Sequence, residues 1–277
     1  MKLWSLLRPN TRNLRVWQVG VLILLFLVWH VLTKPGLIPP VFFASENDAK
    51  FFFGEPVRIL ERVWTWFVID RDIYQHLWVT LLETVLAFAI GTVLGLAMGM
   101  WLALSPVAAA ILDPYIKALN SMPRVILAPI FAVWFGLGVA SKVALGFTLV
   151  FFIVFFNVYQ GVKEVSPTVL ASARMLGASR RQLLRHVYLP SATSWVFSSL
   201  HTSVGLAFVG AVVGEYLGSS RGVGYLILQA EGTFDINTVM AGILVLTAFA
   251  LVLDGIVGRV ERHLMKWQPR AGETEKL

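Results

Sequence analysis

The side chains that most often carry out chemistry are sparse in this chain and form no familiar catalytic or metal-binding pattern. Cysteine is absent, which excludes disulfides, thiolate metal sites and cysteine nucleophiles. The five histidines, at positions 30, 76, 186, 201 and 263, lack the spacing of metal ligands. No Gly-x-x-x-x-Gly-Lys-Ser/Thr loop is present to hold a nucleotide phosphate. We therefore expect no enzyme active site, no metal and no cofactor in this chain.

Polar residues within long apolar segments are the remaining candidates for chemistry. Such residues are rare in a bilayer and often line a path for a polar solute. Hydrogen bonding between packed helices is an equally good explanation for each of them. Two carboxylates, Glu83 and Glu215, are predicted near helix ends, where a carboxylate is ordinary. The candidates for a translocation path are Asn120, Ser121, Asn157, His201, Thr202, Ser203 and Glu215.

The composition predicts a membrane protein. Hydrophobic residues make up 57% of the chain and charged residues only 14%, which is too little polar surface to cover a soluble globule. The net charge of +7 would suggest nucleic acid as the partner of a soluble protein. In a membrane protein, lysines and arginines that anchor cytoplasmic loops explain the same charge. We expect lipid, and no nucleic acid, as a partner.

A membrane-spanning helix needs roughly 20 mostly apolar residues, and six segments satisfy this. The basic N-terminus and first apolar run resemble a secretory signal, but no small-x-small cleavage site follows, so we expect an uncleaved first helix. The third segment contains Pro114, Pro123 and Pro129 and should face protein or a cavity. The six segments are approximately 16–33, 77–104, 111–138, 142–161, 191–217 and 237–258.

The second segment carries Gly91, Gly95 and Gly99, four residues apart on one helix face. A stripe of small residues lets another backbone approach closely, which is how membrane helices pack. Glycines scattered on a lipid-facing helix are the alternative explanation.

The distribution of charge predicts the orientation. With both termini in the cytoplasm, the N-terminal tail, the 105–124 turn, the 162–189 loop and the C-terminal tail hold 16 of the 23 lysines and arginines. The positive-inside rule favours this arrangement. The expected organisation is a tail and first helix (1–33), a periplasmic segment (34–75), a core of five helices (76–261) that includes the 162–189 loop, and a cytoplasmic tail (262–277).

Residues 166–190 predict two short cytoplasmic helices joined by a glycine, which we call the helix–glycine–helix unit. A Ser-Pro pair suits the start of the first helix, and Gly177 should end it. Ser179 and Gln182 form a capping box for the second helix, and Pro190 should close the unit. Small side chains would let a partner protein approach the backbone. An amphipathic connector that lies on lipid headgroups is an equal alternative from physics alone.

This unit resembles the cytoplasmic loop of binding-protein-dependent ABC importer permeases, which reads Glu-Ala-Ala, three residues, Gly, then a spaced Leu-Pro. The resemblance extends over nearly the whole chain. Trp134-Phe135-Gly136-Leu137-Gly138, Gly214-Glu215-Tyr216-Leu217 and Gly222-Val223-Gly224-Tyr225 are similar to the nitrate, sulfonate and taurine branch. The residues that the resemblance assigns to ATPase coupling are Ala171, Ser172, Ala173, Gly177, Ala178, Ser179, Leu189 and Pro190.

The resemblance implies an all-α bundle of the type I ABC importer permease, multi-pass in a bacterial inner membrane. Its expected partners are cytoplasmic ATPase subunits that hold ATP and Mg²⁺, a periplasmic or lipid-anchored solute-binding protein, and a second permease copy in a homodimer. The expected function is import of a small solute, such as a sulfonate, nitrate or a similar molecule. Ala171 departs from the family's leading Glu, which puts that carboxylate's contact in doubt.

Two other classes compete with this interpretation. A secondary carrier would need ionisable residues or broken helices near the middle of the membrane. Apart from the proline-interrupted third segment, the sequence predicts none of these features. An integral membrane enzyme would need a catalytic cluster, and the sequence shows none.

Overall fold

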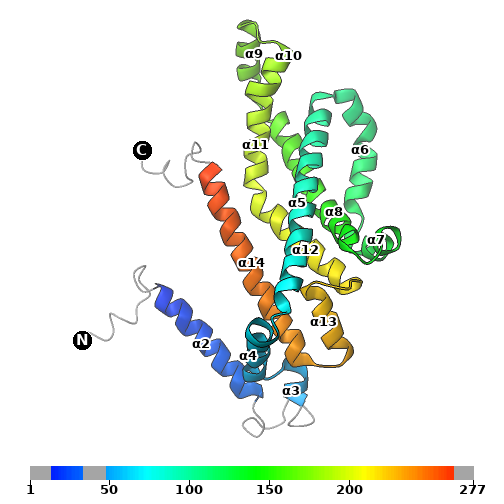
Figure 1. The fold of residues 1–277 in the computed structure, drawn as a ribbon. Coiled ribbons are helices and arrows are strands. Elements are labelled where there is room, and N and C mark those ends of the chain that lie inside the picture. The colour runs from blue at the N-terminus through cyan, green and yellow to red at the C-terminus, as the bar shows by residue number, and fades with distance from the viewer. Residues whose placement is uncertain (1–13, 34–47, 265–277) are drawn as a thin grey trace, which may run out of the picture. The chain divides into compact units, whose positions relative to one another are not determined.

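The computed structural model describes residues 14–33 and 48–264, in which the regular elements are all helical, as predicted. Figure 1 shows their arrangement. The α-helices are α2 (Leu14–Thr33), α3 (Asp48–Phe53), α4 (Pro56–Trp64), α5 (Ile73–Leu104), α6 (Pro106–Ser121), α7 (Leu127–Phe135), α8 (Val139–Lys163), α9 (Pro167–Met175), α10 (Arg180–Leu183), α11 (Leu189–Ser198), α12 (Leu200–Leu217), α13 (Val223–Gly232) and α14 (Ile236–Leu264). Thr65–Asp70 (η1) and Leu184–Tyr188 (η3) are π-helical, and Arg124–Ile126 (η2) is a 3₁₀-helix.

The chain forms two compact units. The first comprises Met1–Asp72 and Ile227–Val245, and the second comprises Ile73–Leu226 and Leu246–Leu277. Most of the candidate site residues lie on α5 to α12 of the second unit. Residues 1–13 of the predicted N-terminal tail and residues 265–277 of the predicted C-terminal tail lie outside the described residues, whereas 262–264 are the last turn of α14.

Five helices, α2, α5, α8, α12 and α14, are long and apolar enough to cross a bilayer. A sixth span results if α6, η2 and α7 are counted together. Four of the six predicted segments therefore correspond to continuous helices, α2, α5, α8 and α14, and the third corresponds to the bent pair. The fifth segment is also divided, because the helical path is interrupted at Ser199 between α11 and α12.

The third segment is not a straight span. Its two halves, Pro106–Ser121 and Arg124–Phe135, meet at an angle of 78°. Met122 is extended, with φ −70° and ψ 133°, and Pro123 has no amide hydrogen to continue the helix. The prediction of a turn over 105–124 is wrong, since most of that stretch is the helix α6. The helix α7 packs on α8, in agreement with the prediction that the segment faces protein, whereas α6 has no buried residue in the single chain, so for α6 this stays a prediction.

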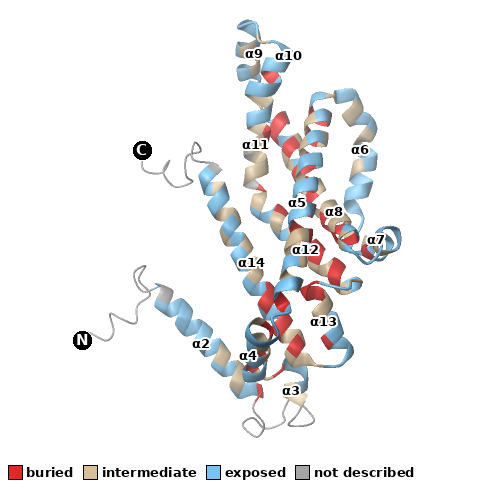
Figure 2. Ribbon diagram, in the orientation of Figure 1, coloured by how far each residue is buried: buried red, intermediate tan, exposed pale blue. Residues whose placement is uncertain are grey.

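The core of the second unit lies between α5, α8 and α12, where Figure 2 shows most of the buried residues. A Cβ added at Gly91 would lie 2.7 Å from the Val150 side chain, and one at Gly95 would lie 2.9 Å from the Phe151 carbonyl oxygen. At Gly99 the distance to the Phe155 carbonyl oxygen would be 2.8 Å. The predicted glycine stripe is therefore the surface on which α5 packs closely against α8.

In the first unit, the segment after α2 is not a plain loop. Its described part folds into α3, α4 and η1, and Gly54 at φ +69° turns the chain between α3 and α4. The Glu55 amide donates a hydrogen bond of 2.8 Å to Asn237 Oδ1. The side chains of α2 are nearly all exposed, as expected of a helix that meets lipid.

Candidate functional site

The first helix of the helix–glycine–helix unit, α9, begins at Pro167, as predicted. Proline suits this position because its fixed φ is helical and the first helical amide has no partner within the helix. Ser166 occupies the N-cap position, but its side chain makes no capping hydrogen bond. The predicted hydroxyl cap is therefore wrong, and the proline alone marks the start of the helix.

Gly177 ends α9 through a Schellman motif. Its φ of +79° lies in the left-handed region, which favours glycine. The Gly177 amide donates to the Arg174 carbonyl oxygen at 3.0 Å, and the Ala178 amide donates to the Ala173 carbonyl oxygen at 3.1 Å. These two bonds satisfy carbonyls that the helix end would otherwise leave unpaired. The predicted stop at Gly177 is confirmed.

Ser179 and Gln182 form the predicted capping box at the start of α10. The Ser179 amide donates to Gln182 Oε1 at 2.7 Å, and the Gln182 amide donates to Ser179 Oγ at 3.3 Å. The predicted end at Pro190 is wrong, because α10 continues through the π-helical stretch Leu184–Tyr188 into α11. Pro190 is the second residue of α11, and the wider π turn before it accommodates the missing amide.

The surface of the helix–glycine–helix unit is exposed and partly apolar. Met175 and Leu176 are 82% and 88% exposed, high values for large apolar side chains that lie next to each other. Figure 2 shows α9 and α10 largely in the colour of exposed residues. A shallow hollow of about 260 Å³ lies between the two helices. It is lined by Ala173, Leu176, Gly177, Ala178, Gln182, Leu183, His186 and Val187.

The predicted path residues on α6 lie at the joint of the broken span. Asn120 and Ser121 are the last two residues of α6, and both are exposed in the single chain. Asn120 accepts hydrogen bonds from the Arg124 guanidinium through its side-chain Oδ1 at 2.5 Å and its carbonyl oxygen at 3.2 Å. Asn157, on α8, donates to the Ile153 carbonyl oxygen at 2.9 Å, within its own helix.

The predicted path residues on α12 have mixed surroundings. The two ring nitrogens of His201 lie 2.7 Å from Asp254 Oδ1 and 2.7 Å from Glu261 Oε2, so this histidine joins α12 to α14. Thr202 is exposed, whereas Ser203 is buried and its hydroxyl has no hydrogen-bond partner. For His201, the explanation by hydrogen bonds between packed helices is the better one.

A buried polar cluster lies where α5, α8 and α12 meet, and we define it as Thr80, Glu83, Lys142 and Glu215. All four side chains are at most 1% exposed. Thr80 donates to Glu215 Oε1 at 2.6 Å, and the Gly224 amide donates to Glu215 Oε2 at 2.8 Å. Glu83 interacts electrostatically with both Glu215 and Lys142, while its Oε2 is buried without a hydrogen-bond partner.

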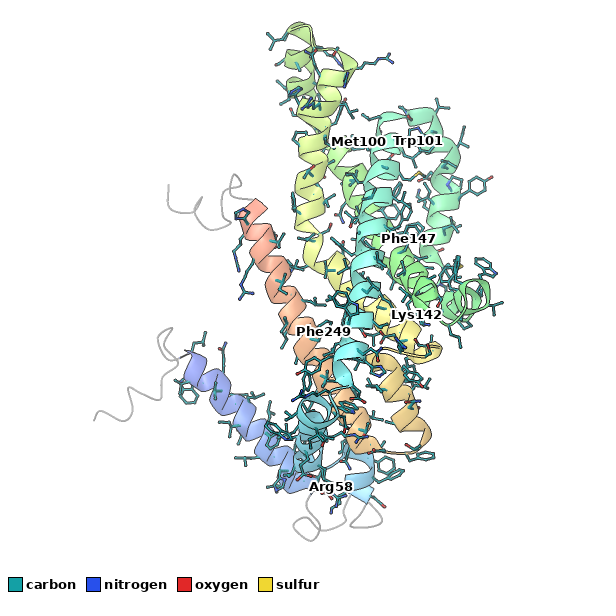
Figure 3. The ribbon with its side chains drawn as sticks, viewed as in Figure 1. Arg58, Met100, Trp101, Lys142, Phe147 and Phe249 are labelled. Carbon is teal, nitrogen blue, oxygen red and sulfur yellow. The ribbon has the colours of Figure 1, made fainter. Side chains whose placement is uncertain are left out.

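Lys142, labelled in Figure 3, holds two interhelix joints together. Its ammonium donates to the Leu137 carbonyl oxygen at 2.6 Å, at the α7–α8 joint, and to the Gly218 carbonyl oxygen at 2.5 Å, after α12. A Cβ at Gly222 would lie 2.1 Å from Glu215 Cδ, so only glycine fits there. The buried polar cluster thus fixes the ends of α8 and α12 against α5.

Glu83 is not near a helix end, in contrast to the prediction. It is the eleventh residue of the 32-residue α5. Glu215 does lie near the end of α12, as predicted, but it is fully buried and hydrogen-bonded. Its side chain links α12 to α5 through Thr80 and does not reach solvent in the single chain.

Residues 91–266 match the family described as "Binding-protein-dependent transport system inner membrane component". The match covers more than half of the chain, from the middle of α5 to the end of α14, and includes the helix–glycine–helix unit. The chain belongs to this family. It is therefore a multi-pass inner-membrane permease of a small-solute ABC importer, and the ATPase of such an importer is a separate subunit.

The permease has relatives over nearly its full length. It is 29% identical to the "Putative aliphatic sulfonates transport permease protein SsuC" of Bacillus subtilis, over 91% of this chain and 88% of that protein. It is 30% identical to the "Taurine transport system permease protein TauC" of Escherichia coli, over 95% and 92% of the respective chains. Among solved structures, an inward-facing form of the MetNI methionine ABC transporter matches with a TM-score of 0.61 and 18% identity, over 69% of this chain and 95% of that one.

Sequence reasoning about the permease missed the buried polar cluster. Lys142 opens a long apolar helix, and an ionisable residue at that place is a signal in itself. Its partners come from α5 and α12, far away in sequence, so no local pattern could connect them. The expectation that ionisable residues are absent from the middle of the spans is also wrong for Glu83, which lies inside α5. Family membership, rather than any lack of such groups, decides against the secondary carrier.

Proposed function

We propose that the helix–glycine–helix unit docks a cytoplasmic ATPase subunit and passes its movement to the spans. The observation that carries this proposal is the geometry of the unit: two short helices whose backbone ends are satisfied locally, with exposed small and apolar side chains at the turn. Small side chains allow a partner to come close, and Met175 and Leu176 offer apolar area to bury. Ala171 is exposed, so the family's Glu at this position would fit without repacking.

The translocation path runs along the broken span, next to a second copy of the permease. Val133 and Trp134 on α7 are 84% and 69% exposed, and such large apolar side chains need lipid or protein against them. The backbone between Ser121 and Arg124 leaves the helical pattern, which a bilayer tolerates only beside protein or a water-filled cavity. A homodimer with these joints facing each other satisfies both requirements.

The solute is a small molecule with an anionic group, delivered by a periplasmic or lipid-anchored binding protein. The names of the relatives, which refer to aliphatic sulfonates and taurine, support this class. ATP and Mg²⁺ belong to the partner ATPase. We expect that closure of the ATPase subunits moves the spans as rigid bodies and switches the path between outward and inward access.

The proposed orientation places both termini in the cytoplasm. A reporter that is active only in the cytoplasm should work when fused after Gly177 or Leu277, and should fail when fused within 45–70. Cytoplasmic activity from the 45–70 fusion would reverse the orientation.

The function is tested with the permease purified from its host together with its copurifying ATPase and reconstituted with the binding protein. Taurine and a series of alkylsulfonates are the first solutes to try. Import that requires ATP on the ATPase side supports the proposal. Import driven by a proton or sodium gradient without ATP would contradict it.

A further inference from the structure

The joint of the broken span brings a cation into the bundle. Arg124 follows Met122 and Pro123, and its side chain turns back toward the end of α6, where Nη2 donates to Asn120 Oδ1 and to the Asn120 carbonyl oxygen. Arg124 was counted above among cytoplasmic charges, but it lies at the joint between two halves of a membrane segment. The sequence analysis did not include it among the path residues.

The guanidinium lies near the middle of a spanning helix. It sits over the Phe152 ring, 4.7 Å from the ring centroid. Phe152 is the fourteenth of the 25 residues of α8, so it lies about 20 Å from one end of that helix and about 16 Å from the other. Since α8 has the length and hydropathy of a span, Arg124 lies well away from both headgroup layers.

Within residues 48–264, Arg124 has no carboxylate as an ion-pair partner. Its Nε is buried and has no hydrogen-bond partner. The contact with Asn120 is to a neutral amide and leaves the charge uncompensated. Lys142 differs, because its ammonium is hydrogen-bonded on two carbonyls and shares its site with two carboxylates.

A cation at this depth is costly unless it is paired, and such residues usually mark a pathway. A guanidinium presents a planar set of donors that matches the oxygens of a carboxylate, sulfonate or phosphate. The broken helix keeps these donors at the point where the backbone already departs from the helix, as in the binding sites of other transporters.

We propose that Arg124, positioned by Asn120, binds the anionic group of the solute as it passes the joint. This inference rests on the proposed function, because it needs the broken span to line the path. The expected ligand class is a small oxyanion group, with a sulfonate as the first choice. The site compensates the charge of Arg124 only while the solute is present, so the solute is held briefly and released.

The test uses the permease assembled with its ATPase and a single cysteine at Ser121→Cys, which is possible because the chain has no native cysteine. Two thiol reagents of similar size are compared: sulfonatoethyl methanethiosulfonate, an anion, and trimethylammonioethyl methanethiosulfonate, a cation. The measured quantity is the reaction rate of the anionic reagent divided by that of the cationic reagent. In an Arg124→Gln variant this ratio should fall by about tenfold, because a unit charge so close acts strongly at low dielectric. Arg124→Lys should keep it.

A cysteine at Ser105→Cys, at the start of α6, is the matched control position. It lies one helix length away, about 24 Å, so Arg124→Gln should leave its ratio unchanged. ATP-driven uptake of an imported sulfonate should also fall at least tenfold in Arg124→Gln, with ATPase copurification retained.

An unchanged labelling ratio at position 121 in Arg124→Gln would overturn the proposal, and so would undiminished uptake. Silence of the Ser121→Cys protein toward both reagents would overturn it as well. A carboxylate of the second copy that pairs with Arg124 would show as an unchanged ratio. The labelling ratio does not need transport, so an importer without an Arg124 site is distinguishable from a chain that is not an ATP-driven importer.

Discussion

The two ends of α8 in this permease are built in opposite ways. At its start, Lys142 lies in a cluster of fully buried side chains that are held by groups from α5 and α12. Beyond its end, about 32 Å away along the helix axis, the helix–glycine–helix unit satisfies its backbone locally and leaves its side chains exposed. The first end stabilises the bundle through tertiary contacts. The helix–glycine–helix unit beyond the second end makes its backbone hydrogen bonds locally, so its exposed side chains are available to contact another protein.

The largest effect should come from removing the cation of the buried polar cluster. Lys142→Met leaves the buried carboxyl pair Glu83 and Glu215 without its neighbouring cation and two carbonyls without their donor, at a cost of about 3–5 kcal/mol in the free energy of unfolding. We expect a large drop in the thermal unfolding midpoint of the detergent-solubilised protein. Lys163→Met, at the exposed end of α8, is the matched control and should change little.

A double variant sharpens this test. Lys142→Met combined with Glu83→Gln removes one member of the carboxyl pair, which no longer has a cation beside it, and should recover part of the lost stability. If Lys142→Met alone unfolds at the wild-type temperature, the buried polar cluster does not hold the joints, and the contrast between the two ends fails.

The glycine stripe should give an intermediate effect. Gly95→Ala places a Cβ 2.9 Å from a backbone carbonyl oxygen of α8, which cannot move without shifting the helix. We expect the free energy of unfolding to fall by about 1–3 kcal/mol, measured by the same thermal unfolding. Gly205→Ala on α12 is the control, since its added Cβ meets nothing within 4 Å. Equal midpoints for the two variants would show that α5 and α8 do not pack closely in the membrane.

The smallest effect should come from an ion pair at the surface of the first unit. Glu55 lies 2.5 Å from Lys50 Nζ and 3.0 Å from Arg58 Nε, and the hydrogen bond from Lys50 lowers the pKa of Glu55 below its usual range. A lowered pKa contributes stability above the pKa of the unfolded chain, and this is lost as the pH falls through the folded value.

Glu55→Gln should therefore lower the free energy of unfolding at neutral pH by about 1 kcal/mol or less, because the pair is partly exposed. The thermal unfolding midpoint should fall slightly. The difference from wild type should vanish in acid. Glu61→Gln, on the exposed side of α4, is the control. A difference that grows as the pH falls would have the wrong sign for this ion pair.

The comparison of the two ends also shows what sequence can predict. The stop at Gly177, the capping box of Ser179 and Gln182, and the glycine stripe of α5 depend on residues close together in the chain, and the structure confirms them. The buried polar cluster depends on residues up to 135 positions apart, and no local pattern predicts it. The sequence analysis missed that the helix continues through Pro190, because the rule that proline ends a helix does not consider a preceding π turn.

The third span shows a partial success. Its prolines and polar residues correctly predict an irregular segment, but the angle of 78° and the placement of Arg124 over Phe152 depend on packing. From the sequence alone, a charged residue next to a proline predicts a loop. Only the tertiary structure places it beside the middle of α8.

The central claim, that the helix–glycine–helix unit docks the ATPase, is tested most directly by copurification from solubilised membranes. Gly177→Arg is compared with Gly136→Arg, because both glycines have a positive φ, +79° and +76°, and open space around an added Cβ. Gly136 also has ψ −177°, a combination that essentially only glycine adopts, so Gly136→Arg is a control with substantial backbone strain of its own. We predict that both insert in the membrane, and that the ATPase is lost only from Gly177→Arg. Retention of the ATPase by Gly177→Arg at the wild-type level would contradict the account.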